Sequence, residues 1–230
     1  MGNPVTVTLQ LVAAITNGVC LSQTPAAAGL LTMNGSLVSG SVATFDVARR
    51  VGITSAGNDS TVVFTVTGTN RWGATISDTA TGANGATVAS TALDFKTVTR
   101  VRTSAATANA IIVGTTATGS TEWQNLDTMR PMFAASVAVS IASGSCTYTV
   151  EHTYDDPNAV GTTLVAPPEN YSIEAQSNKP PLAWANTTLN GLSVAGEAQY
   201  ANWPVFAIRL TITAGTGKAV MQAIQAGLLA

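Results

Sequence analysis

Apolar and polar residues alternate along several stretches of this chain with a period of two, and this pattern constrains the fold more than any other feature. The alternation is clear in residues 5–11, 61–67, 146–154 and 206–213. Successive side chains of a β-strand point to opposite faces, so the pattern places one face on a core and the other toward solvent. The many Thr and Val residues in these stretches also favour strands.

Turn dipeptides separate the alternating stretches at short intervals. Asn and Gly tolerate positive φ, and the pairs that mark turns here are Asn17-Gly18, Asn34-Gly35, Asn84-Gly85 and Asn190-Gly191. Many short strands joined by frequent turns predict an all-β fold, an antiparallel β-sandwich or jelly roll with little helix. Residues 219–229 fit a last strand better than a helix, and we expect them to pair back on residues 206–212 as a hairpin.

Two changes in composition indicate the domain organisation. One falls near residues 119–123, and it divides the chain into an N-terminal β module, residues 1–120, and a C-terminal β module, residues 121–230. The other is a proline-rich stretch, which we interpret as a long loop excursion over residues 156–204 because proline cannot donate to a sheet ladder. The two modules pack together or interleave as one β domain.

The chain is unusually poor in charge. Charged residues make up 10% of the sequence and hydrophobic residues 46%, whereas soluble domains carry roughly 25% charged residues. The formal net charge of −2 argues against a dedicated nucleic-acid-binding protein. Polar residues interrupt every apolar run, so no membrane span is expected, and residues 1–11 lack the basic start of a secretory signal. The spacing of Cys20 and Cys146 matches no metal or redox motif. We expect both to be small buried residues, and the sequence alone does not decide whether they form a disulfide.

Residues with catalytic potential are few. His152 could act as a general base with Glu151 or Asp155, or it could simply pack in a strand among tyrosines. The cluster of Glu151, Asp155 and Asp156 could hold a metal or serve hydrolysis, but an Asp-Asp-Pro sequence more often ends a strand. We therefore predict no catalytic residues, no metal and no cofactor.

Residues that could contact a partner are easier to identify in the sequence than catalytic residues. A basic stripe is expected on one face of a strand, formed by Lys96, Arg100 and Arg102, which are separated by even numbers of residues. The stripe would contact a partner or form a solvated edge. The pair Arg49-Arg50 is a similar case. Tryptophan is enriched at interfaces and in sugar-stacking sites, and all the tryptophans lie near expected turns or loops: Trp72, Trp123, Trp184 and Trp203.

Four runs carry a resemblance to a known group of proteins. They are RRVGITSAGNDSTVVFTVTGTNRWGATISDTATGANG, FKTVTRVRTSAATANAIIVGT, CTYTVEHTYDDP and PVFAIRLTITAGTGKAVMQAIQAG, which together span most of residues 48–227. In this order the runs resemble β-rich structural proteins of tailed-bacteriophage virions. The resemblance implies a virion component, such as a capsid decoration, neck, fiber or tail protein, and it carries over no site residues.

The expected function follows from these observations together. We expect a non-enzymatic virion structural protein that assembles through β-rich interfaces, on the capsid as a decoration protein or at the head–tail neck. Its expected partners are further copies of itself and the major capsid, portal or tail proteins, with no membrane and no specific nucleic acid. Assembly would take place in the cytoplasm of the bacterial host. The alternative is a receptor- or glycan-binding fiber or tail module.

Overall fold

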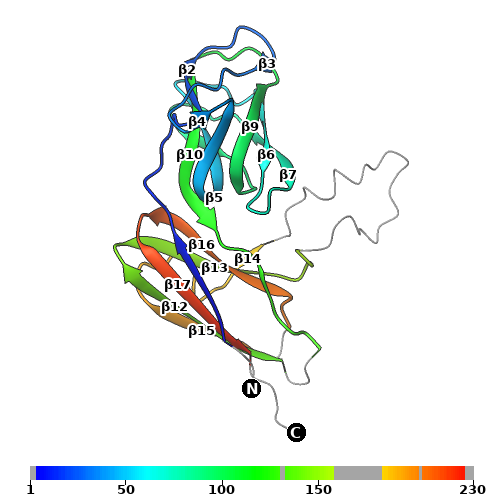
Figure 1. Ribbon diagram of the computed structural model, residues 1–230, viewed down its shortest axis with the longest axis vertical. Helices are drawn as coiled ribbons and strands as arrows, with labels where there is room; N and C mark the ends of the chain where they lie inside the picture. Colours follow the sequence, from blue (N-terminus) through cyan, green and yellow to red (C-terminus); the bar gives the residue numbers. More distant parts are fainter. Residues whose placement is uncertain (1–3, 130–132, 158–182, 202–203, 226–230) are drawn as a thin grey trace, which may run out of the picture. The chain divides into compact units, whose positions relative to one another are not determined.

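The structure, a computed structural model, describes residues 4–129, 133–157, 183–201 and 204–225. Within these ranges the chain forms seventeen β-strands and no helix (Figure 1). The strand pairings are antiparallel throughout both parts of the chain. The predicted all-β, antiparallel fold is therefore confirmed.

The chain divides into two compact units. Unit 1 consists of Met1–Leu11 and Ser120–Ala230, and unit 2 consists of Val12–Gly119. The chain therefore starts in unit 1, runs through all of unit 2 and then returns to unit 1. The first strand belongs with the C-terminal unit and not with an N-terminal module of residues 1–120.

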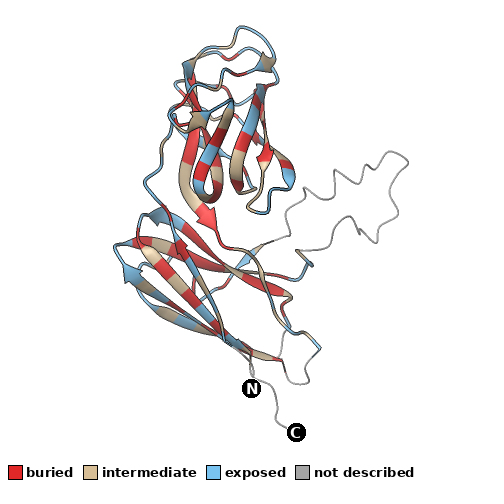
Figure 2. Cartoon of the chain, viewed as in Figure 1, coloured by how far each residue is buried: buried red, intermediate tan, exposed pale blue. Residues whose placement is uncertain are grey.

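The first layer of unit 1 is a four-stranded sheet in the order β1–β17–β12–β15. Its strands are β1 (Val5–Gln10), β17 (Lys218–Gln225), β12 (Ala134–Ser143) and β15 (Gly196–Ala201). The inward positions of these strands are buried, as the alternating colours of Figure 2 illustrate, and they include Leu9, Val137, Val139, Met221 and Ala223. The sheet therefore has one face on the core of unit 1 and one face open to solvent.

The second layer of unit 1 packs against the first to form a β-sandwich. It contains β14 (Trp184–Ala185), β13 (Cys146–Thr153), β16 (Ala207–Gly215) and β11 (Gln124–Asn125). β13 and β16 pair from Cys146↔Gly215 to Thr153↔Ala207. The fully buried side chains of Tyr148, Leu210 and Ile212 fill the interior.

The predicted hairpin between the last two strands is wrong, although the last strand itself is present. β17 pairs with β1 and β12 and lies in the other layer from β16. Both edges of β16 are already occupied, by β13 on one side and by β11 on the other. The Thr121 amide also donates to the Leu210 carbonyl at 2.8 Å. The chain therefore crosses between layers at Gly215, which adopts a positive φ of 83°; residues 226–229 of the predicted strand lie outside the described residues.

The predicted loop excursion over residues 156–204 is too broad. Its described part contains two strands, β14 and β15, and β15 pairs with β12 along its whole length. Both strands are short and lie at sheet edges, where a weak alternation of apolar residues suffices for pairing. Residues 158–182, which hold much of the proline-rich stretch, lie outside the described residues.

Unit 2 is organised around one long, bent strand, β5 (Val42–Ser55). The first part of β5 pairs with β9 (Phe95–Thr103) and β4 (Val38–Ser39), and its second part pairs with β10 (Ile111–Ser120) and β8 (Val88–Ser90). Its register against β9 shifts between Thr44 and Arg49. The remaining strands complete the sheet on either side: β2 (Cys20–Gln23), β3 (Gly29–Leu30), β6 (Val63–Thr69) and β7 (Thr75–Thr81).

The core of unit 2 lies inside this bent sheet. Phe45, Phe64 and Phe95 are buried together with Val51, Val66, Val101 and other aliphatic residues. In β6 the buried residues Phe64 and Val66 alternate with less buried threonines, as the sequence pattern predicts. Cys20 lies in this core, Cys146 is buried in unit 1, and both are free thiols.

Candidate functional site

One candidate interaction surface is the outward face of the four-stranded sheet in unit 1. Cross-strand register places Thr6, Gln222, Ala138 and Glu197 in one row across the four strands. We call this surface the outer sheet face; it comprises Thr6, Thr8, Gln10, Ser136, Ala138, Ser140, Glu197, Gln199, Lys218, Val220, Gln222 and Ile224. Most of these residues are exposed, and Ile224 is 50% exposed.

Charge is nearly absent from the outer sheet face. The strands VTVTLQ, KAVMQAIQ, AASVAVSIAS and GEAQYA contain one basic residue, Lys218, and one acidic residue, Glu197. Neither forms an ion pair with another described residue. A sheet face with so few charges costs little desolvation free energy when another surface covers it.

A shallow groove follows β12 along the middle of the outer sheet face. Ala138 lies in the groove, Gln222 borders it on the β17 side, and Glu197 borders it on the β15 side. Ser136 and Ser140 extend the lining in the two directions along β12. The groove exists because the outward side chains of β12 are small, whereas the longer side chains of Gln222 and Glu197 stand on either side of it.

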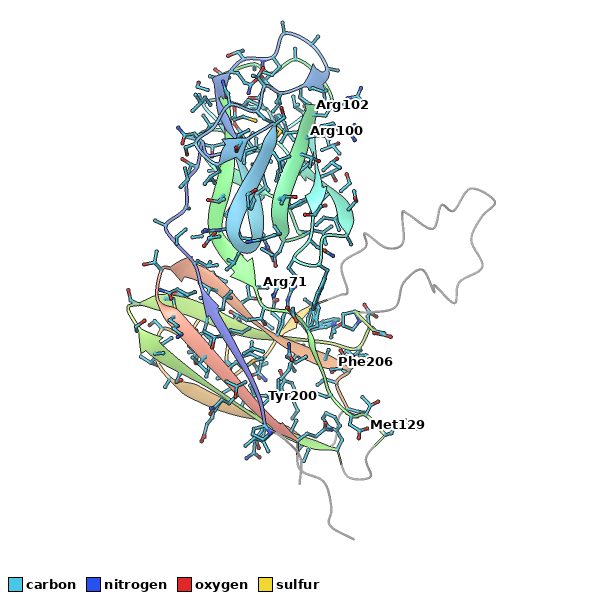
Figure 3. All side chains as sticks on the ribbon, viewed as in Figure 1. Arg71, Arg100, Arg102, Met129, Tyr200 and Phe206 are labelled. Atoms are coloured by element: carbon cyan, nitrogen blue, oxygen red, sulfur yellow. The ribbon has the colours of Figure 1, made fainter. Side chains whose placement is uncertain are left out.

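The basic stripe predicted on β9 is divided by a β-bulge. The register against β6 shifts between Thr67↔Arg100 and Gly68↔Val98, so an extra residue, Thr99, separates the two halves of β9. Arg100 and Arg102 are exposed at one end of the strand, as labelled in Figure 3. Lys96, by contrast, donates from Nζ to the carbonyl oxygens of Phe45 and Asp46, at 2.7 and 3.0 Å. Arg100 and Arg102 thus remain as a pair, and Lys96 binds the backbone of β5.

The tryptophans fall into different environments. Trp72 is 71% exposed at the tip of the β6–β7 turn, where the Asn70 side chain accepts hydrogen bonds from the Trp72 and Ala74 amides. Trp123 is partly buried, and the guanidinium carbon of Arg209 lies 4.5 Å from its ring centroid. Trp184 is 51% exposed on β14, and Trp203 lies outside the described residues.

Arg209 and Glu151 form a hydrogen-bonded ion pair beside Trp123. Arg209 Nε donates to Glu151 Oε2 at 2.6 Å, and the Thr211 hydroxyl donates to the same oxygen at 2.8 Å. Glu151 is therefore occupied within the fold. Neighbouring strand residues point to opposite faces, so Glu151 cannot orient the imidazole of His152 for general-base chemistry.

His152 belongs to an aromatic cluster in unit 1. Its ring lies 5.6 Å from the Tyr154 ring and 5.4 Å from the Tyr200 ring, both in edge-to-face arrangements. The Tyr200 hydroxyl lies 3.4 Å from His152 Nδ1, and Trp184 pairs with His152 across the β13–β14 ladder. Tyr154 and Trp184 are both about half exposed, so the cluster presents two aromatic side chains to solvent. Nowhere in the described ranges do three or more His, Cys, Asp or Glu side chains gather as a metal site would require.

The environment of His152 predicts a pH dependence of stability. Burial lowers the pKa of His152 below its ordinary value of about 6.5. As the pH falls, the unfolded chain therefore binds the proton before the folded chain does, and the free energy of unfolding decreases below about pH 6.5. The chain has one histidine, so urea unfolding of wild type and His152→Gln from about pH 8 to about pH 5 isolates the effect. Equal slopes for the two proteins over this interval would contradict the prediction.

The structure also identifies a buried residue that sequence reasoning misplaced. We compared Arg49-Arg50 with a solvated basic edge, but Arg49 is 1% exposed. Its Nη1 donates to Asp46 Oδ1 at 2.9 Å, its Nη2 donates to the Val12 carbonyl at 3.1 Å, and both Nε and Nη2 donate to the Thr116 carbonyl. Burial alone would raise the pKa of Asp46, but hydrogen bonds from the Val12 backbone amide and from Arg49, together with the charge of Arg49, lower it. Arg49 thus holds the first residue of unit 2 and its last strand, β10, together.

Comparisons with models of known protein families, with curated proteins and with solved structures each find no match. No helix long and apolar enough to cross a membrane occurs in the described part of the chain. The functional interpretation therefore depends on the surfaces described above.

Proposed function

We propose that this protein is a structural component of a tailed-bacteriophage virion, and that it assembles with copies of itself and with other virion proteins through its β-sheet surfaces. The outer sheet face is the observation that carries the proposal, because a complete four-stranded face bears one lysine and one glutamate. Depletion of charge is typical of the central part of protein interfaces. The low charge of the whole chain also limits electrostatic repulsion between neighbouring copies.

The first strand supports assembly by a second route. β1 lies at the edge of its sheet and pairs with β17 alone among the described strands. Its sequence, VTVTLQ, contains no charge and no proline, the residues that natural edge strands commonly use to prevent association. An extended segment of another protein can add to such an edge through backbone hydrogen bonds.

The proposed position is on the capsid surface, as a decoration protein, or at the head–tail neck. The partners in these positions are the major capsid, portal or tail proteins, and assembly takes place in the host cytoplasm. Supporting this role, the carboxylate of Glu151 and the imidazole of His152 have structural partners instead of facing one another as a reactive pair.

One observation favours a receptor- or glycan-binding role as the second candidate. Trp184 and Tyr154 are 51% and 55% exposed and flank His152. Exposed aromatic rings can stack on the apolar faces of sugars. The Trp184→Ala variant separates the two functions, because loss of host adsorption with normal incorporation into particles would favour the second candidate.

Analysis of purified particles tests the main proposal. We expect mass spectrometry of phage particles purified by density gradient to detect the protein in a fixed ratio to the major capsid protein. Imaging of the same particles at side-chain resolution should place it on the capsid or neck with its sheets in contact with neighbouring subunits. Absence of the protein from intact, infectious particles would overturn the proposal.

A further inference from the structure

We propose that the outer sheet face binds the same face of a second copy of this chain around a two-fold axis that passes over Ser140. The inference rests on the proposed function, since it names the surface and the partner for self-assembly. It starts from the positions of Lys218 and Glu197 on that face, which lack ion-pair partners among the described residues.

Lys218 and Glu197 lie diagonally across the outer sheet face. Glu197 is in the same row as Gln222, because Ala138 pairs with both residues, and Lys218 lies four positions before Gln222 on β17. β12 separates the two strands, so the Cα atoms of Lys218 and Glu197 are about 16 Å apart, given a spacing of about 4.8 Å between strands and about 3.3 Å per residue. This separation is far too long for an ion pair within one chain.

The midpoint of this diagonal falls on Ser140. Ser140 pairs with Val220, which lies halfway between Lys218 and Gln222, and β12 lies halfway between β17 and β15. A two-fold axis parallel to the sheet, perpendicular to the diagonal and crossing it over Ser140 brings Lys218 of each copy opposite Glu197 of the other. The one positive and the one negative charge of the face are thus both neutralised by a single symmetry operation.

The residues near the axis allow the two faces to approach closely. Residues on a two-fold axis meet their own equivalents, so a charged side chain there would be repelled by itself. Ser140 is small, exposed and uncharged, and Ala138 beside it lies in the groove along β12. Gln222 and Ile224 stand on the β17 border of this groove and leave the strip over β12 open.

The area of the face sets the strength of the contact. Four strands at about 4.8 Å spacing and at most eight residues at about 3.3 Å give an upper bound of roughly 500 Å² in projection for each copy, or about 1,000 Å² for the pair. Even this upper bound only reaches the size at which specific interfaces begin, about 1,000–1,200 Å² in total. We therefore expect a reversible dimer that becomes fully occupied at the high local concentration inside a particle.

Charge exchange tests the arrangement without disturbing the core. In analytical ultracentrifugation over a range of concentrations, Lys218→Glu and Glu197→Lys should each raise the dimer Kd about tenfold, because each creates two like-charge contacts around the axis. The double variant, Lys218→Glu with Glu197→Lys, restores both opposite-charge contacts and should return the Kd to within about twofold of wild type. Ser140→Glu should abolish the dimer, whereas Arg102→Glu, an exposed change on β9 of unit 2, should leave it intact.

The outcomes separate this inference from the proposed function. Single variants that dimerise like wild type, or a double variant no better than the singles, would overturn the two-fold arrangement. A wild-type chain that stays monomeric at all concentrations would overturn it as well. In each of these cases, detection of the protein in purified particles would still support the virion role, because contacts with other virion proteins do not require this dimer.

Discussion

Replacement of Arg49 with methionine is expected to destabilise unit 2 by about 2–4 kcal/mol, because its buried guanidinium donates several hydrogen bonds and hydrogen bonds to charged groups contribute about 1.5–3 kcal/mol each. The guanidinium of Arg49 satisfies three acceptors, namely Asp46 and the carbonyl oxygens of Val12 and Thr116. Methionine fills much of the same volume without supplying a donor. The partly buried carbonyl groups of Val12 and Thr116 would then lose their hydrogen bonds to Arg49, at a cost of about 1 kcal/mol or more each.

The thiol of Cys20 reports on unit 2 alone when Cys146 is replaced by alanine. Cys20 is fully buried, and burial raises its pKa to about 12, so it should react with a thiol reagent only when unit 2 opens. The free energy of opening follows from the labelling rate in increasing urea. Arg102→Met is the matched control, because Arg102 is exposed on β9 and its replacement should cost less than about 0.5 kcal/mol. Equal labelling rates for the Arg49 and Arg102 variants would show that the hydrogen bonds of Arg49 contribute nothing to the stability of unit 2.

In unit 1, the largest effect is expected for Tyr148→Ala, with a loss of about 3–5 kcal/mol. Tyr148 is fully buried, and its hydroxyl donates to the Val194 carbonyl at 2.9 Å. Its backbone also exchanges two hydrogen bonds with Leu192. Tyr148 therefore holds the segment that leads into β15, the strand that carries Glu197. Truncation should loosen this segment as well as leave a cavity.

The stability of unit 1 in the Tyr148 variants can be measured from the rate at which Cys146 is labelled, in a background where Cys20 is replaced by alanine. Cys146 is buried two residues away on the same strand, and burial raises its pKa. Tyr148→Phe keeps the ring and removes the hydrogen bond, so it should cost about 1 kcal/mol. Tyr154→Ala serves as the control, because Tyr154 is 55% exposed and should contribute less than about 1 kcal/mol. A Tyr148→Ala protein as stable as Tyr154→Ala would refute the structural role assigned to Tyr148.

The strands with clear alternation could be predicted from the sequence because each has one face on a core. β1, β6 and β16 all begin and end within a few residues of the predicted stretches. The partners of these strands could not be predicted, since pairing depends on residues far apart in the chain. β1 pairs with the last strand, and no local feature of VTVTLQ indicates this. The predicted hairpin of the last two strands was wrong for the same reason: two consecutive strands can pair only where one of them has an unpaired edge.

The candidate surfaces were harder to predict than the strands. Alternation along the strand predicted that Lys96, Arg100 and Arg102 share one face. The bulge at Thr99 puts Lys96 out of phase with the two arginines, and a bulge cannot be detected by counting residues. The burial of Arg49 was missed because its acceptors come from Val12 and Thr116, which are 37 and 67 residues away. The outer sheet face did leave a signal, since no charged residue precedes Asp46 and none lies between Arg130 and Glu151.

The contacts of Arg49 have a consequence for how unit 2 is built into the chain. Unit 2 is one continuous segment, Val12–Gly119, and a single nitrogen, Nη2 of Arg49, binds both the carbonyl at its start and a carbonyl of its last strand. The two points of entry and exit are therefore neighbours, as in domains that tolerate insertion into a host fold. Because its start and its last strand are held together in this way, unit 2 has the form of an insertion between Leu11 and Ser120 of unit 1.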